Sequence, residues 1–194
     1  MSPTHANISQ VAPRLWIGGD LATQQPTLAA VQLHEITDLG ITDIVDCRVE
    51  WSDEDWVTAA HPEIGYHWLG VDDAGQRMPD AWFDTGTALI REALDAGGTV
   101  LAHCHMGINR GPSMGFAAML TLGWDPIDAL DAIRRARPIA YVAYAEDAVD
   151  WWLRRRGADR AAREVAAVHL AEWRRQHHLD LVGTIRRVRM GHGA

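Results

Sequence analysis

The chain has 194 residues, 47% of them hydrophobic, which is enough for one domain with a substantial core and an appendage. Its 26 acidic residues outnumber its 18 basic residues, all of them arginine, so nucleic acid is not an expected partner. Apolar runs are too short for a membrane span, no secretory signal is evident, and two cysteines are too few for a disulfide framework.

Strand and helix signals alternate along the chain. Short β-branched or aromatic stretches between turns predict strands at residues 11–19, 41–47, 65–71 and 99–102. Apolar residues at helical spacing predict helices at residues 27–39, 80–96, 113–120, 125–137, 144–156 and 158–176. A surface loop with a turn of helix is expected at residues 50–63, and residues 179–194 have no clear form. The alternation predicts a layered α/β domain.

Charge is distributed unevenly between the two ends of the chain. Residues 1–150 hold 8 arginines and 22 acidic residues, whereas residues 151–194 hold 10 arginines and 4 acidic residues. We therefore expect a domain at residues 1–157 and a basic helical extension at residues 158–194. The favoured interpretation is a helix packed on an acidic body; the alternative is a tail that recruits an acidic partner, nucleic acid or an anionic membrane.

The stretch from His103 to Arg110 has the strongest chemical pattern. Cys104 follows a predicted buried strand, and Arg110, six residues later, precedes a predicted buried helix. At such a turn, backbone N–H groups and the helix dipole favour an anion, including a thiolate. The same N–H groups can bind phosphate oxygens while Arg110 donates two further hydrogen bonds. Residues 104–110, called the cysteine loop below, are therefore predicted to hold a nucleophile at the base of a phosphate site.

A proton donor is expected from a neighbouring loop. In layered α/β domains the reactive loops follow the carboxyl ends of the strands, so the turns after Cys47, Val71 and His103 can meet in one crevice. Asp72 and Asp73 end one of these strands, and either could serve as a general acid. A solvated loop or a helix cap is the alternative role for such a pair.

The cysteine loop resembles a known signature: His-Cys, five residues and Arg, with Gly three residues after Cys. His103, Cys104, Gly107 and Arg110 match it position for position. Over about residues 8–155 the chain resembles dual-specificity-type members of the cysteine-dependent protein tyrosine phosphatase superfamily. A sulfur-transferring rhodanese usually has four residues between the loop ends, which does not fit. The resemblance implies a central, mostly parallel sheet flanked by helices.

The resemblance also assigns roles. The family's general acid lies in a Val-x-Asp segment with an aromatic residue ten positions on, which maps the acid to Asp73 with Phe83 as the aromatic residue. Cys104 is then the nucleophile of a phosphomonoester hydrolase with a phosphocysteine intermediate, and His103 supports it. The phosphate-binding residues become His105, Met106, Gly107, Ile108, Asn109 and Arg110. No metal or other cofactor is implied.

One position departs from the family. A Ser or Thr usually follows the arginine and assists breakdown of the phosphocysteine, but here Gly111 stands there. Arg110, Gly111 and Pro112 resemble instead the loop of rhodanese-fold cell-cycle phosphatases, which act without that hydroxyl. The alternative function is a catalytically weak pseudophosphatase that binds phosphate as an interaction module.

Other residues near the proposed crevice have alternative roles. Cys47 is either a buried apolar residue or a redox partner of Cys104. Arg48 either reaches the crevice or pairs with Glu50 at the surface. A metal site at His103 and His105 is disfavoured because no second Cys/His pair lies at suitable spacing.

Substrate and location follow as expectations. The cysteine loop has no basic residue between Cys104 and Arg110, and the preceding body is acidic, which disfavours a highly charged substrate. A phosphorylated protein, on tyrosine or on serine/threonine, is the expected substrate, with free nucleotide or RNA phosphates left open. A reducing cytoplasm suits a nucleophile that must stay a thiol. The sequence does not indicate the oligomeric state.

Overall fold

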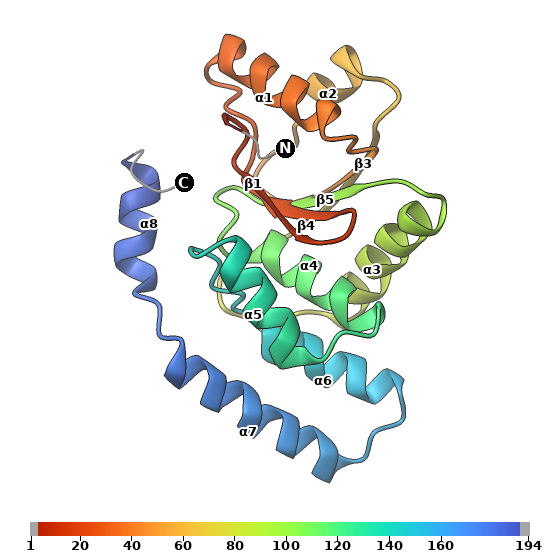
Figure 1. Ribbon diagram of the computed structural model, residues 1–194, viewed down its shortest axis with the longest axis vertical. Helices are drawn as coiled ribbons and strands as arrows, with labels where there is room; N and C mark the ends of the chain where they lie inside the picture. Colours follow the sequence, from red (N-terminus) through yellow and green to blue (C-terminus); the bar gives the residue numbers. More distant parts are fainter. Residues whose placement is uncertain (1–3, 191–194) are drawn as a thin grey trace.

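A five-stranded sheet lies at the centre of the computed structural model, which describes residues 4–190 (Figure 1). Its strand order is β1-β2-β5-β3-β4. The strands are β1 (Ile8–Ala12), β2 (Leu15–Gly18), β3 (Asp43–Arg48), β4 (Gly65–Val71) and β5 (Val100–His103). β1 is antiparallel to β2, and all other neighbouring strands are parallel, which confirms the expected mostly parallel sheet.

Helices cover both faces of this sheet (Figure 1). One face carries α1 (Pro26–Asp38) and α2 (Glu54–Ala60). The other carries α3 (Asp80–Asp95), α4 (Arg110–Thr121), α5 (Pro126–Ala136) and α6 (Ala145–Arg155). The molecule therefore has the three-layer arrangement that buries both faces of a parallel sheet.

Each face of the sheet has its own apolar core. Side chains alternate between the two faces along a strand, so Val45 and Cys47 of β3 join the core under α3 to α6. Ile44, between Asp43 and Val45, joins the core under α1 and α2. In β5, Ala102 joins the core under α3 to α6, and Leu101 joins the core under α1 and α2. This double burial accounts for the apolar residues 100–102 of β5, whereas β3 also buries the charged residues Asp46 and Arg48.

Three segments differ from the sequence-based expectations. The sequence predicts one strand over residues 11–19, but a turn at Arg14, with φ of 59°, divides the region into β1 and β2. α4 begins at Arg110 rather than at residue 113, so the last residue of the cysteine loop is already helical. The basic end, residues 179–194, has no predicted form, but α8 (Leu181–Arg189) occupies most of its described part.

The extension after residue 157 packs through its first helix, α7 (Arg160–Gln176). Leu170 and Trp173 are buried in the core under α5 and α6. α8 then runs beside the body of the molecule (Figure 1). Across the described residues, no helix combines the length and the apolar character needed to cross a membrane.

Candidate active site

The cysteine loop lies at the carboxyl end of β5, the middle strand of the sheet. β5 ends at His103 and α4 begins at Arg110, so the loop joins the two as expected. The Cys104 amide donates to the Gly18 carbonyl at 3.1 Å, which ties the loop to the end of β2. The Cys104 side chain is 3% exposed. The thiol thus sits at the bottom of a crevice at the carboxyl edge of the sheet.

The backbone of the loop has the geometry of an anion site. The carbonyls of His105, Met106, Gly107 and Ile108 all accept hydrogen bonds from groups outside the loop. Within residues 4–190, the amides of residues 105–109 donate none. Carbonyls held outward with amides left unpaired form a concave set of donors that suits a phosphate.

Arg137 holds two of these carbonyls from beneath the loop. Its guanidinium donates to the carbonyl oxygens of Gly107 at 2.6 Å and Met106 at 3.1 Å, and to Asn7 Oδ1 at 2.7 Å. Burial lowers the pKa of Arg137 to about 10, and negative charge at Cys104 acts in the opposite direction. Arg137 therefore stays charged at neutral pH and adds positive potential below the loop.

Two glycines are required by close contacts. Gly107 has φ of 63°, and a Cβ there would overlap Arg137 and the backbone of Gly18. Gly111, where the family usually has Ser or Thr, lies against β5: a Cβ would come within 2.8 Å of the His103 backbone. In this chain, α4 approaches the strand too closely for a side chain at residue 111.

Arg110 presents one free edge of its guanidinium to the crevice. Glu50 accepts from Nη1 and Nη2, both at 2.8 Å, and the Val71 carbonyl accepts from Nη1 at 3.0 Å. Burial opposes its charge, but the hydrogen bonds to Glu50 raise the pKa of Arg110 above its usual value. The same contact lowers the pKa of Glu50. Arg110 Nε is buried and has no hydrogen-bond partner among the described residues. Nε and the second Nη2 proton can therefore bind two oxygens of one anion.

Asp73 faces this free edge. Its Oδ2 lies 3.5 Å from Arg110 Nε, and its Oδ1 accepts from Asn109 Nδ2 at 2.5 Å and Tyr144 Oη at 2.7 Å. Burial, together with the hydrogen bond to Asp73, raises the pKa of Tyr144. The pocket wall includes Asp73 and does not include Asp72. Of the two candidate acids, the structure therefore brings Asp73 to the cysteine.

A buried ionic cluster supports the loop from behind. Arg48 is fully buried and pairs with Asp46 at 2.7 Å, Asp53 at 2.9 Å and Asp20 at 3.2 Å. Arg48 therefore does not pair with Glu50, which was one of its two expected roles, because Glu50 is taken by Arg110. Burial alone would raise the pKa of Asp46, but its hydrogen bonds with Arg48 hold it below the usual value.

Two histidines connect this cluster to the loop. His105 Nδ1 lies 2.8 Å from Asp20, and His103 Nε2 lies 3.7 Å from Asp46. Burial lowers the pKa of His103, which favours its neutral form. The ionic cluster thus fixes residues on both sides of Cys104.

A cavity of about 430 Å³ opens over the cysteine loop. It brings together most of the expected site residues, namely Asp73, Cys104, His105, Met106, Ile108, Asn109 and Arg110. Three expected residues do not line it: Gly107 lies against Arg137, His103 is buried behind the loop, and Cys47 is buried in the core. Sequence reasoning missed Glu50, Tyr141 and three residues of α8, which also line it.

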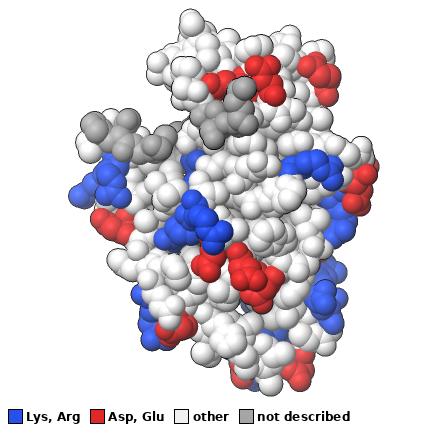
Figure 2. All heavy atoms as spheres, viewed as in Figure 1, with Lys and Arg blue, Asp and Glu red and all other residues white. Residues whose placement is uncertain are grey.

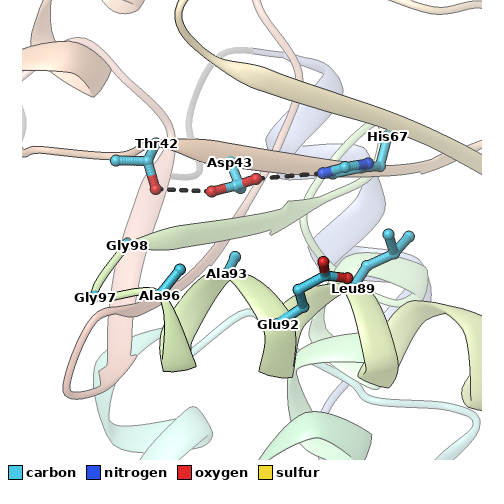
Figure 3. Close-up of a pocket in the computed structure, with 9 residues that line it drawn as sticks. All are labelled: Thr42, Asp43, His67, Leu89, Glu92, Ala93, Ala96, Gly97 and Gly98. Carbon is cyan, nitrogen blue, oxygen red and sulfur yellow. Dashed lines mark hydrogen bonds and ion pairs between the residues drawn. The ribbon is translucent and has the colours of Figure 1, made fainter.

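A second hollow, of about 520 Å³, lies near the amino ends of β3 and β5, away from the cysteine loop (Figure 3). Asp43 at the start of β3 bridges Thr42 and His67 there, at 2.8 and 3.3 Å, with Glu92 of α3 nearby. This hollow has two carboxylates, no arginine and no nucleophile in its wall. It therefore lacks the groups that would bind and attack a phosphate.

The fold of the molecule resembles those of several solved structures. Human DUSP28 is 21% identical with a TM-score of 0.62, covering 78% of this chain and 96% of that chain. A mouse dual specificity phosphatase complexed with zinc tungstate is 20% identical with a TM-score of 0.64, covering 80% and 92%. The human tyrosine phosphatase-like serine/threonine/tyrosine-interacting protein is 19% identical with a TM-score of 0.56, covering 74% and 94%. At these identities the matches show a shared fold.

The family is shown by the sequence itself. A model of the dual specificity phosphatase catalytic domain matches residues 25–144, more than half of the chain. The match contains the whole cysteine loop together with Glu50, Asp73, Arg137 and Tyr144. It supports phosphatase activity in general. The chain therefore belongs to the family of dual specificity phosphatase catalytic domains.

Proposed function

We propose that this chain hydrolyses phosphate monoesters on proteins, at phosphotyrosine, phosphoserine or phosphothreonine, through a phosphocysteine on Cys104. The observation that carries the proposal is the set of unpaired donors around that sulfur. The amides of residues 105–109 and the buried Nε of Arg110 have no hydrogen-bond partner among the described residues, although Asp73 Oδ2 lies 3.5 Å from Nε. Such donors are stabilised by an oxyanion and cost nothing to reorganise when one binds.

The first step transfers the phosphoryl group to the enzyme. The Cys104 thiolate attacks phosphorus, the S–P bond forms, and the ester P–O bond breaks with its electrons moving to the leaving oxygen. The loop amides and the free edge of Arg110 hold the equatorial oxygens. Asp73 gives its proton to the leaving oxygen. Its Oδ2 suits this role because Oδ1 is already held by Asn109 and Tyr144.

The second step releases phosphate. Asp73, now ionised, takes a proton from a water molecule as that water attacks phosphorus. The P–S bond breaks and Cys104 returns as the thiolate. Gly111 supplies no hydroxyl to this step. Slow hydrolysis of the phosphocysteine would make the chain a phosphate-binding module, which is the second candidate function.

Replacing Cys104 with serine is expected to lower steady-state hydrolysis of para-nitrophenyl phosphate by at least about 10⁴-fold, because the nucleophile is lost. Cys47→Ala is the matched control, since it removes the other cysteine from the core and is expected to keep turnover. A wild-type protein that gives one stoichiometric burst supports the binding module instead. Equal turnover by wild type and Cys104→Ser would refute the proposed mechanism.

Replacing Asp73 with asparagine is expected to reduce hydrolysis of phenyl phosphate by about 10²- to 10⁴-fold, because its poor leaving group needs a proton. The loss is smaller for para-nitrophenyl phosphate, whose leaving group is more acidic. Asp72→Asn makes the same charge change outside the pocket, and an equal effect of the two variants would remove Asp73 from its assigned role.

We propose that Cys47 is a reversible redox partner of Cys104. We also propose that the protein works in a reducing compartment such as the cytoplasm, where Cys104 stays a thiol until an oxidant reaches it. Both thiols are buried in the same core, and Asp46 and His103, the residues just before them, are direct partners across β3 and β5. Neighbouring strands lie about 5 Å apart, within reach of a disulfide. Burial raises the pKa of Cys47 well above its usual value, so Cys104 is the thiol that peroxide would attack.

Peroxide treatment is expected to produce a peptide pair joined through Cys47 and Cys104. Peroxide oxidises Cys104 to a sulfenic acid, and the Cys47 thiol then displaces water to form the disulfide. Dithiothreitol should restore activity. In Cys47→Ala, peroxide inactivation should become irreversible. Mass spectrometry that finds no linked peptide in the oxidised wild type would contradict this role.

A further inference from the structure

Helix α8 forms part of the wall around the candidate active site. Leu181, Ile185 and Arg189 line the same cavity as Cys104 and Arg110. The family match ends at residue 144, so these three residues come from the extension rather than from the family's own domain. The pocket of this chain is therefore completed by a segment that the family model does not include.

The three residues form one stripe along the helix. They are spaced four residues apart, so they lie on one face of α8, with two apolar side chains followed by one arginine. The other basic side chains of α8, Arg186 and Arg187, do not line the cavity. The stripe thus presents an apolar wall that ends in a cation.

Arg189 differs from the cation at the base of the pocket. Arg110 is held by Glu50, whereas Arg189 has no ion pair with any residue between 4 and 190. The space-filling view shows basic side chains gathered over α8 (Figure 2). Arg189 is exposed, so its guanidinium is available for an anionic group of a ligand in the pocket.

The helix that precedes α8 is fixed to the body of the molecule. Besides its buried Leu170 and Trp173, α7 carries Arg163, which pairs with Asp150 at 2.8 Å, and Arg174, which pairs with Glu146 of α6. Arg174 also lies 5.1 Å from the ring centroid of Tyr141, another residue of the pocket wall.

The short link between the two helices is fixed as well. Arg134 of α5 donates to the His177 carbonyl at 3.2 Å, and the His177 ring stacks on Trp173 at 4.6 Å. The chain that leads into α8 is therefore fixed to the body, and within α8 Thr184 is fully buried.

We propose that α8 determines substrate choice: Leu181 and Ile185 contact the ring of a phosphotyrosine, and Arg189 binds a carboxylate of an acidic residue beside it in a peptide. This inference rests on the proposed phosphatase function. Apolar contacts suit an aromatic ring, which phosphoserine lacks. Among the described residues that line the cavity, Arg189 is the one arginine without an ion pair, which suits one carboxylate, whereas a polyphosphate would need several cations.

The charge test uses two phosphotyrosine peptides that differ only in having glutamate or alanine beside the phosphotyrosine. The wild type is expected to prefer the glutamate peptide, and Arg189→Gln is expected to reduce the ratio of the two kcat/KM values about three- to fivefold. Arg186→Gln, on the same helix but outside the cavity, is the control and should keep the wild-type ratio. The preference should also weaken in high salt.

The ring test uses Ile185→Ser, with Val182→Ser as the control on an exposed face of α8. Ile185→Ser is expected to raise KM for the phosphotyrosine peptide about fivefold, and to change KM for the matching phosphoserine peptide less. The inference on α8 is overturned if Arg189→Gln and Arg186→Gln behave alike, or if Ile185→Ser affects both peptides equally. If Arg189→Gln lowers kcat/KM for an inositol bisphosphate more than it lowers kcat/KM for the acidic peptide, the assignment of a peptide as substrate is overturned.

The outcome separates this inference from the proposed function. If the wild type turns over no phosphate ester, the proposed function fails. The α8 test then continues as binding of fluorescent phosphopeptides to Cys104→Ser, with and without Arg189→Gln. A selective loss of affinity for the glutamate peptide supports the role of α8, and equal affinities in the two proteins refute it.

Discussion

Arg110→Lys is expected to lower kcat/KM for para-nitrophenyl phosphate by about 10²- to 10³-fold, the cost of losing a preorganised donor to a developing oxyanion. Lysine keeps the charge. Unlike arginine, it cannot donate two parallel N–H groups to one phosphate from one edge while another edge binds a carboxylate. In the structure Glu50 takes one edge of the guanidinium and leaves Nε and one Nη2 proton for the ligand. kcat should fall and KM should rise, because the arginine contacts the phosphate before and during the reaction.

The matched control for this variant is Arg77→Lys. Arg77 is an exposed arginine that also pairs with a carboxylate, Asp150, but it lies outside the cavity. Its replacement is expected to leave kcat/KM within about twofold, as for most surface ion pairs. Activity of Arg110→Lys close to that of the control would mean that the free edge of Arg110 is not where phosphate binds.

Arg48→Met is expected to destabilise the fold by about 3–5 kcal/mol, because it leaves buried carboxylates without their cation. Asp46 is fully buried and Asp53 is 2% exposed, so neither can be rehydrated without opening the structure. Urea denaturation measures the loss. Arg155→Met, which breaks an exposed pair with Asp84, serves as the control and should cost less than about 1 kcal/mol.

The loss of unfolding free energy in Arg48→Met should depend on pH. In the wild type the pKa of Asp46 lies below its usual value, so this carboxylate adds stability above its unfolded-state pKa and loses it as the pH falls through the folded-state pKa. In the variant the unpaired carboxylate is stabilised by taking up a proton. The difference between the two proteins should therefore shrink on acidification. A difference under about 1 kcal/mol at neutral pH would show that the cluster contributes little.

The centre of the site could be predicted because its residues are close together in sequence. Cys104, Gly107 and Arg110 lie within one turn whose form follows from a buried strand, a glycine and a buried helix. The end of β4 predicts Asp72 or Asp73 as the acid, because parallel strands end at one edge of the sheet, and the resemblance to the family selects Asp73.

The supporting residues could not be predicted because they reach the site across long stretches of sequence. Glu50 contacts Arg110 over 60 positions, Tyr144 contacts Asp73 over 71, and Arg137 contacts Asn7 over 130. Local patterns do not record which of several equivalent charged residues will be partners after folding.

The fold shows the same limit. Strands buried on both faces could be predicted, β5 from its short apolar run and β3 from its short β-branched stretch. The hairpin of β1 and β2 was missed because its turn at Arg14 has no glycine to mark the left-handed backbone. α8 was missed because its polar composition hides a stripe of only three residues that meets the pocket.

The most direct test of the central claim, that Cys104 attacks phosphorus, is to capture the intermediate. Asp73→Ala is mixed with para-nitrophenyl phosphate, quenched in acid within milliseconds, digested and examined by mass spectrometry. The peptide containing Cys104 is predicted to gain the mass of one phosphoryl group, and the same peptide from Cys104→Ser is not. Steady turnover with no phosphoryl group on Cys104, or with the group on another residue, would contradict the account.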